Sequence, residues 1–423
     1  MIYMVKHRVI FFLSFMIAFP VYGGLSTQSL SKQELQPNNK YGADFEEAWS
    51  FIRDNYAWLE EKTTDWNRVY DHFMPFAENA ENNTEFIALL EQLIEQLYDH
   101  HAHLGVNTSS SPRMVPSGSD IWAEFRKDKV LITSVRGNSG AENEGVKAGM
   151  EIISVGGVPV LKAVENRIPV TISEPGPEVL DWALQSVIAG YHDEPVQIEV
   201  SAGDQTKKME FQPELRDQTG DLLSMDILDK NTGYIQIHNS LGNVDLIREW
   251  DRALEKLKDT DALILDLRNT PGGGNSTVAR GIMSRLISQT KPYQMHELPS
   301  EEREFGVKRI WVEQAAPRGP FTYTKPVAVL VGRWTGSMGE GLAIGLDGME
   351  RATVIGTPMA GLRGALYNHT LPNTGIEIRI PAERLYHIDG TPREKFLPPV
   401  LVKSDLGVEE LPETILNSDF INQ

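Results

Sequence analysis

A serine set among glycines is the residue with the clearest catalytic potential in this chain. Ser337 lies in Gly336-Ser337-Met338-Gly339, after an apolar stretch typical of a buried strand and before a helical pattern. A nucleophile at the start of a helix meets free backbone N–H groups, which stabilise an oxyanion. The spacing differs from the Gly-x-Ser-x-Gly elbow of α/β-hydrolases, because Gly336 directly precedes Ser337. A helix cap is the alternative role for this serine.

A second glycine-rich turn follows another apolar strand pattern, residues 262–267. Its consecutive glycines, Gly272, Gly273 and Gly274, let the backbone approach a ligand and point N–H groups into a cavity. The turn lacks the Gly-Lys-Ser/Thr ending of a P-loop and the spaced glycines of a dinucleotide site, which argues against phosphate binding.

A nucleophilic serine needs a base. Residues 356–365 contain no lysine, and Arg363 cannot serve, because a guanidinium keeps its proton. Histidine is the other choice, and a compact cluster follows the first helical patterns: Asp99, His100, His101 and His103. The cluster also suits a metal, although no further ligand that would complete the site is identifiable, and a solvated helix end is the third interpretation.

The elements that must position these residues form three predicted modules. Helical spacing of apolar residues predicts a helical domain over 43–107, followed by a linker rich in Ser and Pro. Residues 119–215 include a strand pattern at 129–135. Residues 221–410 alternate strands and helices, which predicts a mainly parallel sheet with helices on its faces. The expected elements there are strands 233–237, 262–267 and 327–331 and helices 244–257, 278–287 and 341–346. Both glycine-rich turns follow the carboxyl ends of strands, where such sheets place their sites.

The middle module resembles a PDZ domain. Residues 145–160 run from a glycine-hydrophobic turn through a strand to a tight Gly156-Gly157 turn. PDZ domains capture the C-termini of peptides by adding a peptide strand to a sheet edge, so a peptide C-terminus is an expected partner. The alternative is a module that only packs against its neighbours.

Composition excludes several classes of function. The protein has 423 residues, 41% of them hydrophobic and 23% charged, which suits a packed protein of two or three domains. Its formal net charge of −19 argues against a nucleic-acid partner, which would require a basic face. Without cysteine it has neither disulfides nor thiolate metal ligands nor a cysteine nucleophile.

The N-terminus is typical of a secretory signal. Lys6 and Arg8 precede an apolar run, and small residues follow, which predicts a signal peptide over 1–23 and a flexible lead-in over 24–42. A retained membrane anchor is the alternative, but the run is short for a membrane span. We expect a bacterial periplasmic or secreted protein with no stable membrane anchor after cleavage.

In combination these features resemble the serine peptidases of the C-terminal processing (tail-specific) and tricorn type. The resemblance covers residues 43–402 and is carried by an ordered set: Leu97-Tyr98-Asp99-His100-His101, residues 145–160, Asp266-Leu267-Arg268, Gly272-Gly273, Thr335 to Glu340, and Glu394 to Pro398. It implies an α/β multidomain fold with an N-terminal helical domain, a PDZ-like β-rich module and a crotonase-like α/β catalytic core.

The resemblance also implies roles for particular residues. The tail-specific branch uses a Ser–Lys dyad and the tricorn branch uses Ser, His and Glu; because the lysine is missing, this sequence is more similar to the tricorn branch. The implied catalytic residues are Ser337 as nucleophile, His101 as general base and Glu394 as the orienting acid. The implied oxyanion hole consists of the N–H groups of Met338 and of Gly272 or Gly273. His100 replaces the serine that precedes the tricorn histidine. No metal and no organic cofactor is expected.

The predicted function is therefore that of a serine-type endopeptidase that cleaves peptide or protein substrates through an acyl-enzyme. Three alternatives stay open. The family includes non-catalytic relatives, so the same fold can hold a ligand or peptide without cleaving it. A metallohydrolase would use His100, His101 and His103. An esterase would use the same serine.

Overall fold

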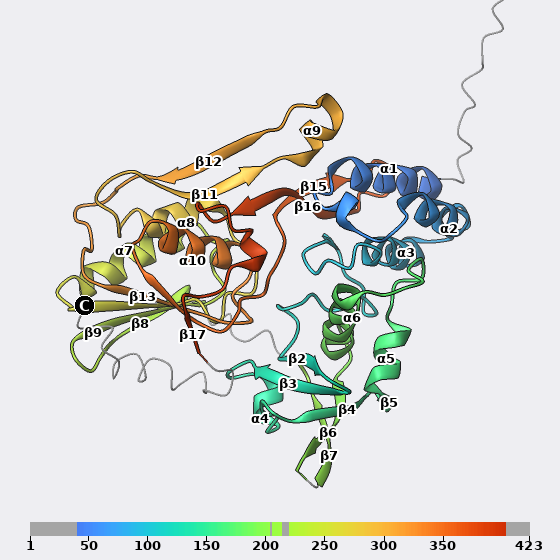
Figure 1. Ribbon diagram of the computed structural model, residues 1–423, viewed down its shortest axis with the longest axis horizontal. Coiled ribbons are helices and arrows are strands. Elements are labelled where there is room, and N and C mark those ends of the chain that lie inside the picture. Colours follow the sequence, from blue (N-terminus) through green and yellow to red (C-terminus); the bar gives the residue numbers. More distant parts are fainter. Residues whose placement is uncertain (1–39, 204, 214–219, 403–423) are drawn as a thin grey trace, which may run out of the picture. The chain divides into compact units, whose positions relative to one another are not determined.

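The computed structural model describes residues 40–203, 205–213 and 220–402 (Figure 1), and these residues pack as one compact unit. The predicted signal peptide lies outside the described residues, as does the predicted lead-in up to residue 39. Helix α1 begins at Lys40, inside the range predicted for the lead-in. Across the described residues, no helix is both long and apolar enough to cross a membrane.

The first module consists of three α-helices and one 3-10 turn: α1 (Lys40–Asn55), η1 (Leu59–Glu61), α2 (Trp66–Glu78) and α3 (Asn83–Glu95). The side chain of Asp65 caps α2, and that of Asn82 caps α3 by accepting from the Glu85 amide. The indole N–H groups of Trp49 and Trp66 each donate to the other residue's carbonyl, at 2.8 and 3.1 Å. Both tryptophans belong to the buried core of this module.

This helical core is completed by residues from the far end of the sequence. Strand β1 (His103–Leu104) pairs antiparallel with β16 (Glu377–Tyr386), and Ile378 and Ile380 belong to the same buried cluster as the helices. A two-residue strand leaves no periodic signal, so the sequence did not predict this pairing. The pairing fixes the end of the histidine cluster against the C-terminal part of the protein.

The second module is an antiparallel sheet in the order β2-β3-β4-β6-β7. Its elements are β2 (Ile121–Arg126), β3 (Lys129–Val135), α4 (Gly140–Asn143), β4 (Glu151–Val155), β5 (Val158–Pro159), α5 (Val160–Asn166), α6 (Pro177–Ala189), β6 (Val196–Ala202) and β7 (Gln205–Phe211). Strand β2 is an edge of this sheet. Helix α6 packs on it, and buried Gln185 donates from Nε2 to the Ala123 carbonyl at 2.7 Å.

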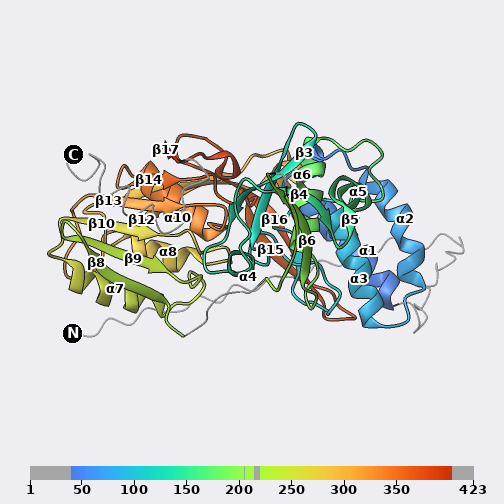
Figure 2. The ribbon, with the colours of Figure 1, turned by 90° about the horizontal axis from the view of Figure 1, so that it is seen from below.

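The third module contains a six-stranded sheet in the order β17-β14-β13-β10-β9-β8, parallel except for β8. Its strands are β8 (Leu223–Leu228), β9 (Thr232–Ile237), β10 (Ala262–Asp266), β13 (Val327–Val331), β14 (Thr353–Gly356) and β17 (Val400–Leu401); its helices are α7 (Leu246–Leu257), α8 (Ser276–Met283) and α10 (Met338–Gly348). All residues of β10 and β13 are buried, as their unbroken apolar sequences predict. Alternate residues of these strands share one core with α7, α8 and α10 (Figure 2).

A second sheet joins this module, in the order β1-β16-β11-β12 with β15 beside β16. Its remaining elements are β11 (Lys291–Glu297), α9 (Pro299–Phe305), β12 (Ile310–Ala315), β15 (Ala365–Thr370) and the 3-10 turn η2 (Arg393–Lys395). The structure is thus mixed α/β, as predicted. The predicted domain boundaries stay predictions.

Candidate active site

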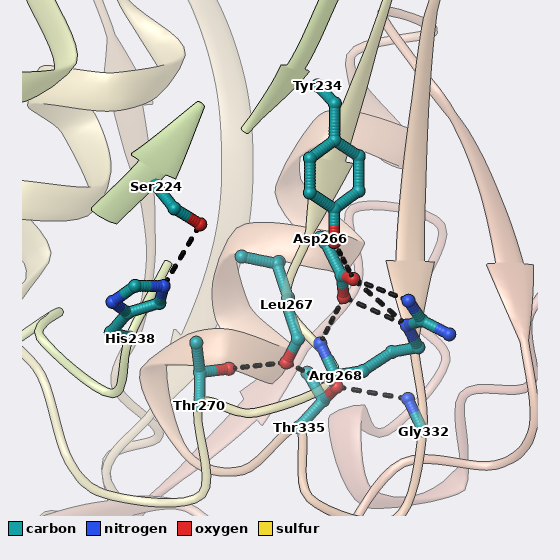
Figure 3. A network of polar contacts seen from close by, with 9 residues as sticks. All are labelled: Ser224, Tyr234, His238, Asp266, Leu267, Arg268, Thr270, Gly332 and Thr335. Atoms are coloured by element: carbon teal, nitrogen blue, oxygen red, sulfur yellow. Dashed lines mark hydrogen bonds and ion pairs between the residues drawn. The ribbon is translucent and has the colours of Figure 1, made fainter. Parts of the chain in front are cut away.

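Hydrogen bonds join the two glycine-rich turns at the carboxyl ends of β10 and β13. The hydroxyls of Thr270 and Thr335 both donate to the Leu267 carbonyl, at 2.7 and 2.9 Å, and the Gly332 amide donates to the Thr335 hydroxyl (Figure 3). The Gly336 amide donates to the Thr270 carbonyl at 3.1 Å. These bonds fix the backbone on both sides of the predicted site.

A buried ion pair supports the turn that contains Gly272, Gly273 and Gly274. Asp266, at the end of β10, has no exposed surface and binds the Arg268 guanidinium at 2.6 Å (Figure 3). The Tyr234 hydroxyl donates to the same carboxylate at 2.7 Å, and burial together with this carboxylate raises the pKa of Tyr234. The Asp-Leu-Arg motif of the sequence therefore anchors the turn.

Ser337 occupies the N-cap of α10 with φ +51°. This backbone region is unfavourable for a residue with a Cβ, and such strain clusters at functional sites. The serine follows a buried strand and opens a helix, as the sequence predicted.

Glu340 ends the motif that begins at Thr335, and the sequence alone predicted no role for it. Its fully buried carboxylate accepts from the amides of Ser337 at 2.8 Å, Gly361 at 2.9 Å and Leu362 at 3.3 Å. Burial raises the pKa of Glu340 to about 7, against the opposing effects of Arg393 and the three amides. Its position, three residues after a serine N-cap, is the capping-box signal that could have revealed it.

His101 lies against the same loop that Glu340 binds. Its Nδ1 is hydrogen-bonded to the Arg363 carbonyl, and its amide donates to the Asp99 carboxylate at 3.0 Å. Because a carbonyl can only accept, Nδ1 carries the proton and Nε2 keeps the free lone pair that a general base needs. Burial, with a smaller effect of Arg393, lowers the pKa of His101 to about 4, so the ring is neutral at neutral pH.

Glu394 lies in η2, and the preceding residue, Arg393, bonds to the loop that holds His101. Arg393 donates from Nη2 to the carbonyls of Leu362 and Gly364, both at 2.8 Å. Glu394 Oε2 is buried without a hydrogen-bond partner. An unpaired buried carboxylate oxygen is costly and calls for an explanation in a native structure.

The loop of residues 361–364 is bonded to Glu340, to His101 and to Arg393, the neighbour of Glu394. Glu340 links it to Ser337, the Arg363 carbonyl links it to His101, and Arg393 links it to Glu394. Among the described residues, no hydrogen bond joins Ser337, His101 and Glu394 directly. Catalytic hydrogen bonds commonly tighten only when substrate is bound.

The predicted oxyanion donors differ in their availability. The Gly272 amide already donates to Asn239 Oδ1 at 2.7 Å, which the sequence analysis did not foresee. No backbone or side-chain acceptor in the described residues engages the amides of Gly273 or Met338. Met338 is the first residue of α10, so its N–H is one of the free donors of a helix start.

The second module docks on both turns. The Trp334 indole donates to the Ser119 carbonyl at 2.7 Å, Arg333 pairs with Glu124 at 2.9 Å, and Arg136 donates to Asn269 Oδ1 at 2.6 Å from Nη2. Edge strand β2 therefore lies close to the site rather than open to solvent along its length.

A charge network joins the three modules beside His101. Glu178 of α6 accepts on Oε1 from Lys62 and from Arg363, both at 2.8 Å. The Lys62 side chain is 1% exposed, and burial, opposed by Asp99, lowers its pKa to about 8. Arg363 is the residue whose carbonyl holds His101, so Glu178 supports the loop of residues 361–364.

Glu178→Ala is expected to lower the free energy of unfolding by about 1–3 kcal/mol at pH 7, because Lys62 would be left buried and charged. The lysine part of this loss should shrink as pH rises through about 8, where Lys62 is neutral in the native protein. Urea unfolding of the native protein and of the variant at pH 6.5 and at pH 9 measures the loss of stability and its dependence on pH. Glu165→Ala, which removes an exposed pair with Lys162, is the matched control. A loss that does not depend on pH would contradict this account.

The histidine cluster does not form a metal-binding group. His100 stacks on Trp182 with ring centroids 6.0 Å apart, while His103 Nδ1 bonds to the His101 carbonyl. Within the described ranges, no group of three or more His, Asp or Glu side chains is arranged to hold a metal ion.

Comparisons with known proteins agree with this architecture. Residues 231–400 match the profile of Peptidase family S41, and residues 37–95 match the Tricorn protease C1 domain. The part of the chain that carries Ser337 is therefore similar to Peptidase family S41.

One curated relative is Tricorn protease homolog 1 of Streptomyces coelicolor, with 22% identity over 349 residues. The match covers 77% of this protein and 29% of the relative, so the protein spans less than a third of that relative's length.

Solved structures share the fold. The photosystem II D1 C-terminal processing protease has 16% identity and a TM-score of 0.56, covering 90% of this protein and 98% of its own length. Mature CPAF has 13% identity and a TM-score of 0.60, with the same shares covered.

Proposed function

We propose that this protein is a serine endopeptidase that cleaves peptide bonds through an acyl-enzyme on Ser337. The observation that carries the proposal is the strained N-cap conformation of Ser337, whose amide is tied through Glu340 to the loop that holds His101. Strain at this position presents a nucleophile beside a helix N-terminus, and the tie fixes it relative to a base.

In the proposed mechanism His101 Nε2 removes the proton of the Ser337 hydroxyl as the oxygen attacks the substrate carbonyl. The carbonyl electron pair moves onto oxygen, where the amides of Met338 and Gly273 stabilise it. His101 then returns the proton to the leaving amine, and water resolves the ester by the reverse route. The Arg363 carbonyl orients the ring through Nδ1, and the negative charge of Glu394 stabilises the imidazolium.

Further assignments belong to the same proposal. The β2–β7 module is PDZ-like and binds a peptide C-terminus, and the third module is a crotonase-like catalytic core. Residues 1–23 are a signal peptide that directs the protein to the periplasm or the exterior. N-terminal sequencing of the exported protein tests the cleavage after Gly23.

A fluorophosphonate probe tests the proposal without knowledge of the substrate. We expect one covalent adduct on Ser337 of the purified mature protein and none in His101→Ala. A folded protein that stays unlabelled would instead support the non-catalytic ligand-binding alternative. Parallel assays with an ester and the matching amide separate esterase from peptidase activity.

The rate of fluorophosphonate labelling at Ser337 is expected to depend on pH. Because burial holds the pKa of His101 near 4, the base stays neutral and competent down to about pH 5, and the rate should fall with a midpoint near 4. The rate falls toward low pH because Nε2 becomes protonated only when the pH drops below the lowered pKa of His101. His103→Ala should keep the same midpoint. A midpoint at 6.5 or above would contradict this account and would point to a solvated histidine or to Glu340, whose pKa is about 7.

A further inference from the structure

The Gly272 amide is engaged by a side chain from another strand end. Asn239 follows β9 and accepts on Oδ1 from the Gly272 N–H at 2.7 Å. A Cβ on Gly272 would lie 2.7 Å from Asn239 Oδ1 and 2.9 Å from Nδ2. The carboxamide therefore lies directly against the Gly272 backbone, and only glycine leaves room for it.

The backbone of Asn239 is itself unusual. Its φ is +50°, the left-handed region that asparagine tolerates better than most residues with a Cβ. Asn239 lies two residues beyond the end of β9 at Ile237. The bond to Gly272 fixes the carboxamide in one orientation, because only Oδ1 can accept from an N–H.

The turn that binds this carboxamide, residues 271–274, lies against the residues on both sides of Ser337. A Cβ on Gly274 would lie 2.9 Å from Met338 Cβ, and a Cβ on Gly336 would lie 2.9 Å from the Pro271 carbonyl oxygen. Residues 271–274 therefore line the serine turn at contact distance, and Asn239 lies against the middle of that stretch.

We propose that Asn239 is a catalytic residue whose Nδ2 group donates to the oxyanion, an inference that rests on the proposed acyl transfer at Ser337. With Oδ1 held by Gly272, the Nδ2 group makes no hydrogen bond to another of the described residues. The predicted donor at Gly272 is thus replaced by a side-chain donor that this same amide orients. As the Ser337 oxygen bonds to the substrate carbon, the carbonyl electron pair moves onto oxygen, and Asn239 stabilises it without transferring a proton.

Side-chain variants distinguish two roles for Asn239. In one its Nδ2 group donates to the oxyanion, and in the other Asn239 only blocks the Gly272 amide from doing so. Asn239→Ala removes the donor, Asn239→Gly removes it while suiting the positive φ, and Asn239→Asp keeps an acceptor for Gly272 but replaces the donor with an anion. Asn231→Ala is the matched control, since Asn231 also has φ +50° but bonds to Asp259 and Asp261 at the turn between β8 and β9.

The experiment measures fluorophosphonate labelling of Ser337, affinity for an acetylated peptide aldehyde, and thermal unfolding of the mature protein. We expect all three Asn239 variants to label about 10²–10³-fold more slowly and to bind the aldehyde correspondingly less tightly, with Asn239→Asp at least as impaired as the others. Asn231→Ala should match the native protein. Unfolding of Asn239→Gly should stay close to native, which separates lost chemistry from lost structure.

Other outcomes overturn the proposal. Native or faster labelling in Asn239→Gly would make the Gly272 amide the donor and Asn239 its block. Native labelling in Asn239→Asp would exclude Nδ2 as a donor. If the native protein itself is unlabelled at Ser337, the proposed peptidase function fails, and the role of Asn239 fails with it; slow variants beside a reactive native protein support both.

Discussion

Ser337→Ala is expected to lower the rate of peptide or ester hydrolysis by about 10⁴–10⁶-fold and to abolish fluorophosphonate labelling. Without the hydroxyl no acyl-enzyme can form, and what remains is the contribution of the oxyanion donors and substrate binding. The measurement is kcat/KM for the first substrate found, beside the labelling yield.

The matched control addresses the helix-cap role of the same residue. Ser139 caps α4 by accepting from the Glu142 amide, far along the sequence from the catalytic turn, so Ser139→Ala tests the loss of a serine cap alone. That variant should lose about 1 kcal/mol of stability and retain its activity. If Ser337→Ala loses stability but keeps its rate, the serine is a cap and the nucleophile lies elsewhere.

His101→Ala is expected to lower the same rate by about 10⁴-fold or more, because the neutral Nε2 that accepts the serine proton is gone. The double variant with Ser337→Ala should be no slower than Ser337→Ala alone, since residues that act as one unit are not additive. Rate measurements on the two single variants and the double variant form the cycle.

His103→Ala supplies the comparison within the cluster. Its ring bonds through Nδ1 to the His101 carbonyl rather than to the loop at Arg363, so its loss should cost much less than that of His101. Should His103→Ala be the severe variant and His101→Ala the mild one, the assignment of the base would be wrong by two positions.

Much of the fold follows from local pattern. The stretches at 129–135 and 327–331 are strands β3 and β13 with the predicted bounds, because continuous β-branched and apolar residues suit a buried strand. The helix predicted over 244–257 is α7, beginning at Leu246. The helix predicted over 278–287 ends earlier, at Met283 in α8, since the remaining apolar residues are buried by the tertiary core without helical geometry.

In the candidate site, too, some features follow from local sequence pattern and others depend on contacts between distant residues. The order strand, glycine, Ser337, helix is local in the sequence, so the sequence by itself determined where a nucleophile would be exposed. The family resemblance added His101 and Glu394 as candidates, but nothing in a single sequence places a histidine against a loop hundreds of residues away.

Only the tertiary structure decided which groups meet. The bond from His101 to Arg363 joins positions 262 apart, and the bond from Gly272 to Asn239 joins positions 33 apart. Glu340, Asn239 and Glu178 each owe their role to partners from other strands, loops or modules. Spacing along the sequence encodes periodicity within one element, whereas contacts between elements depend on how the whole core packs.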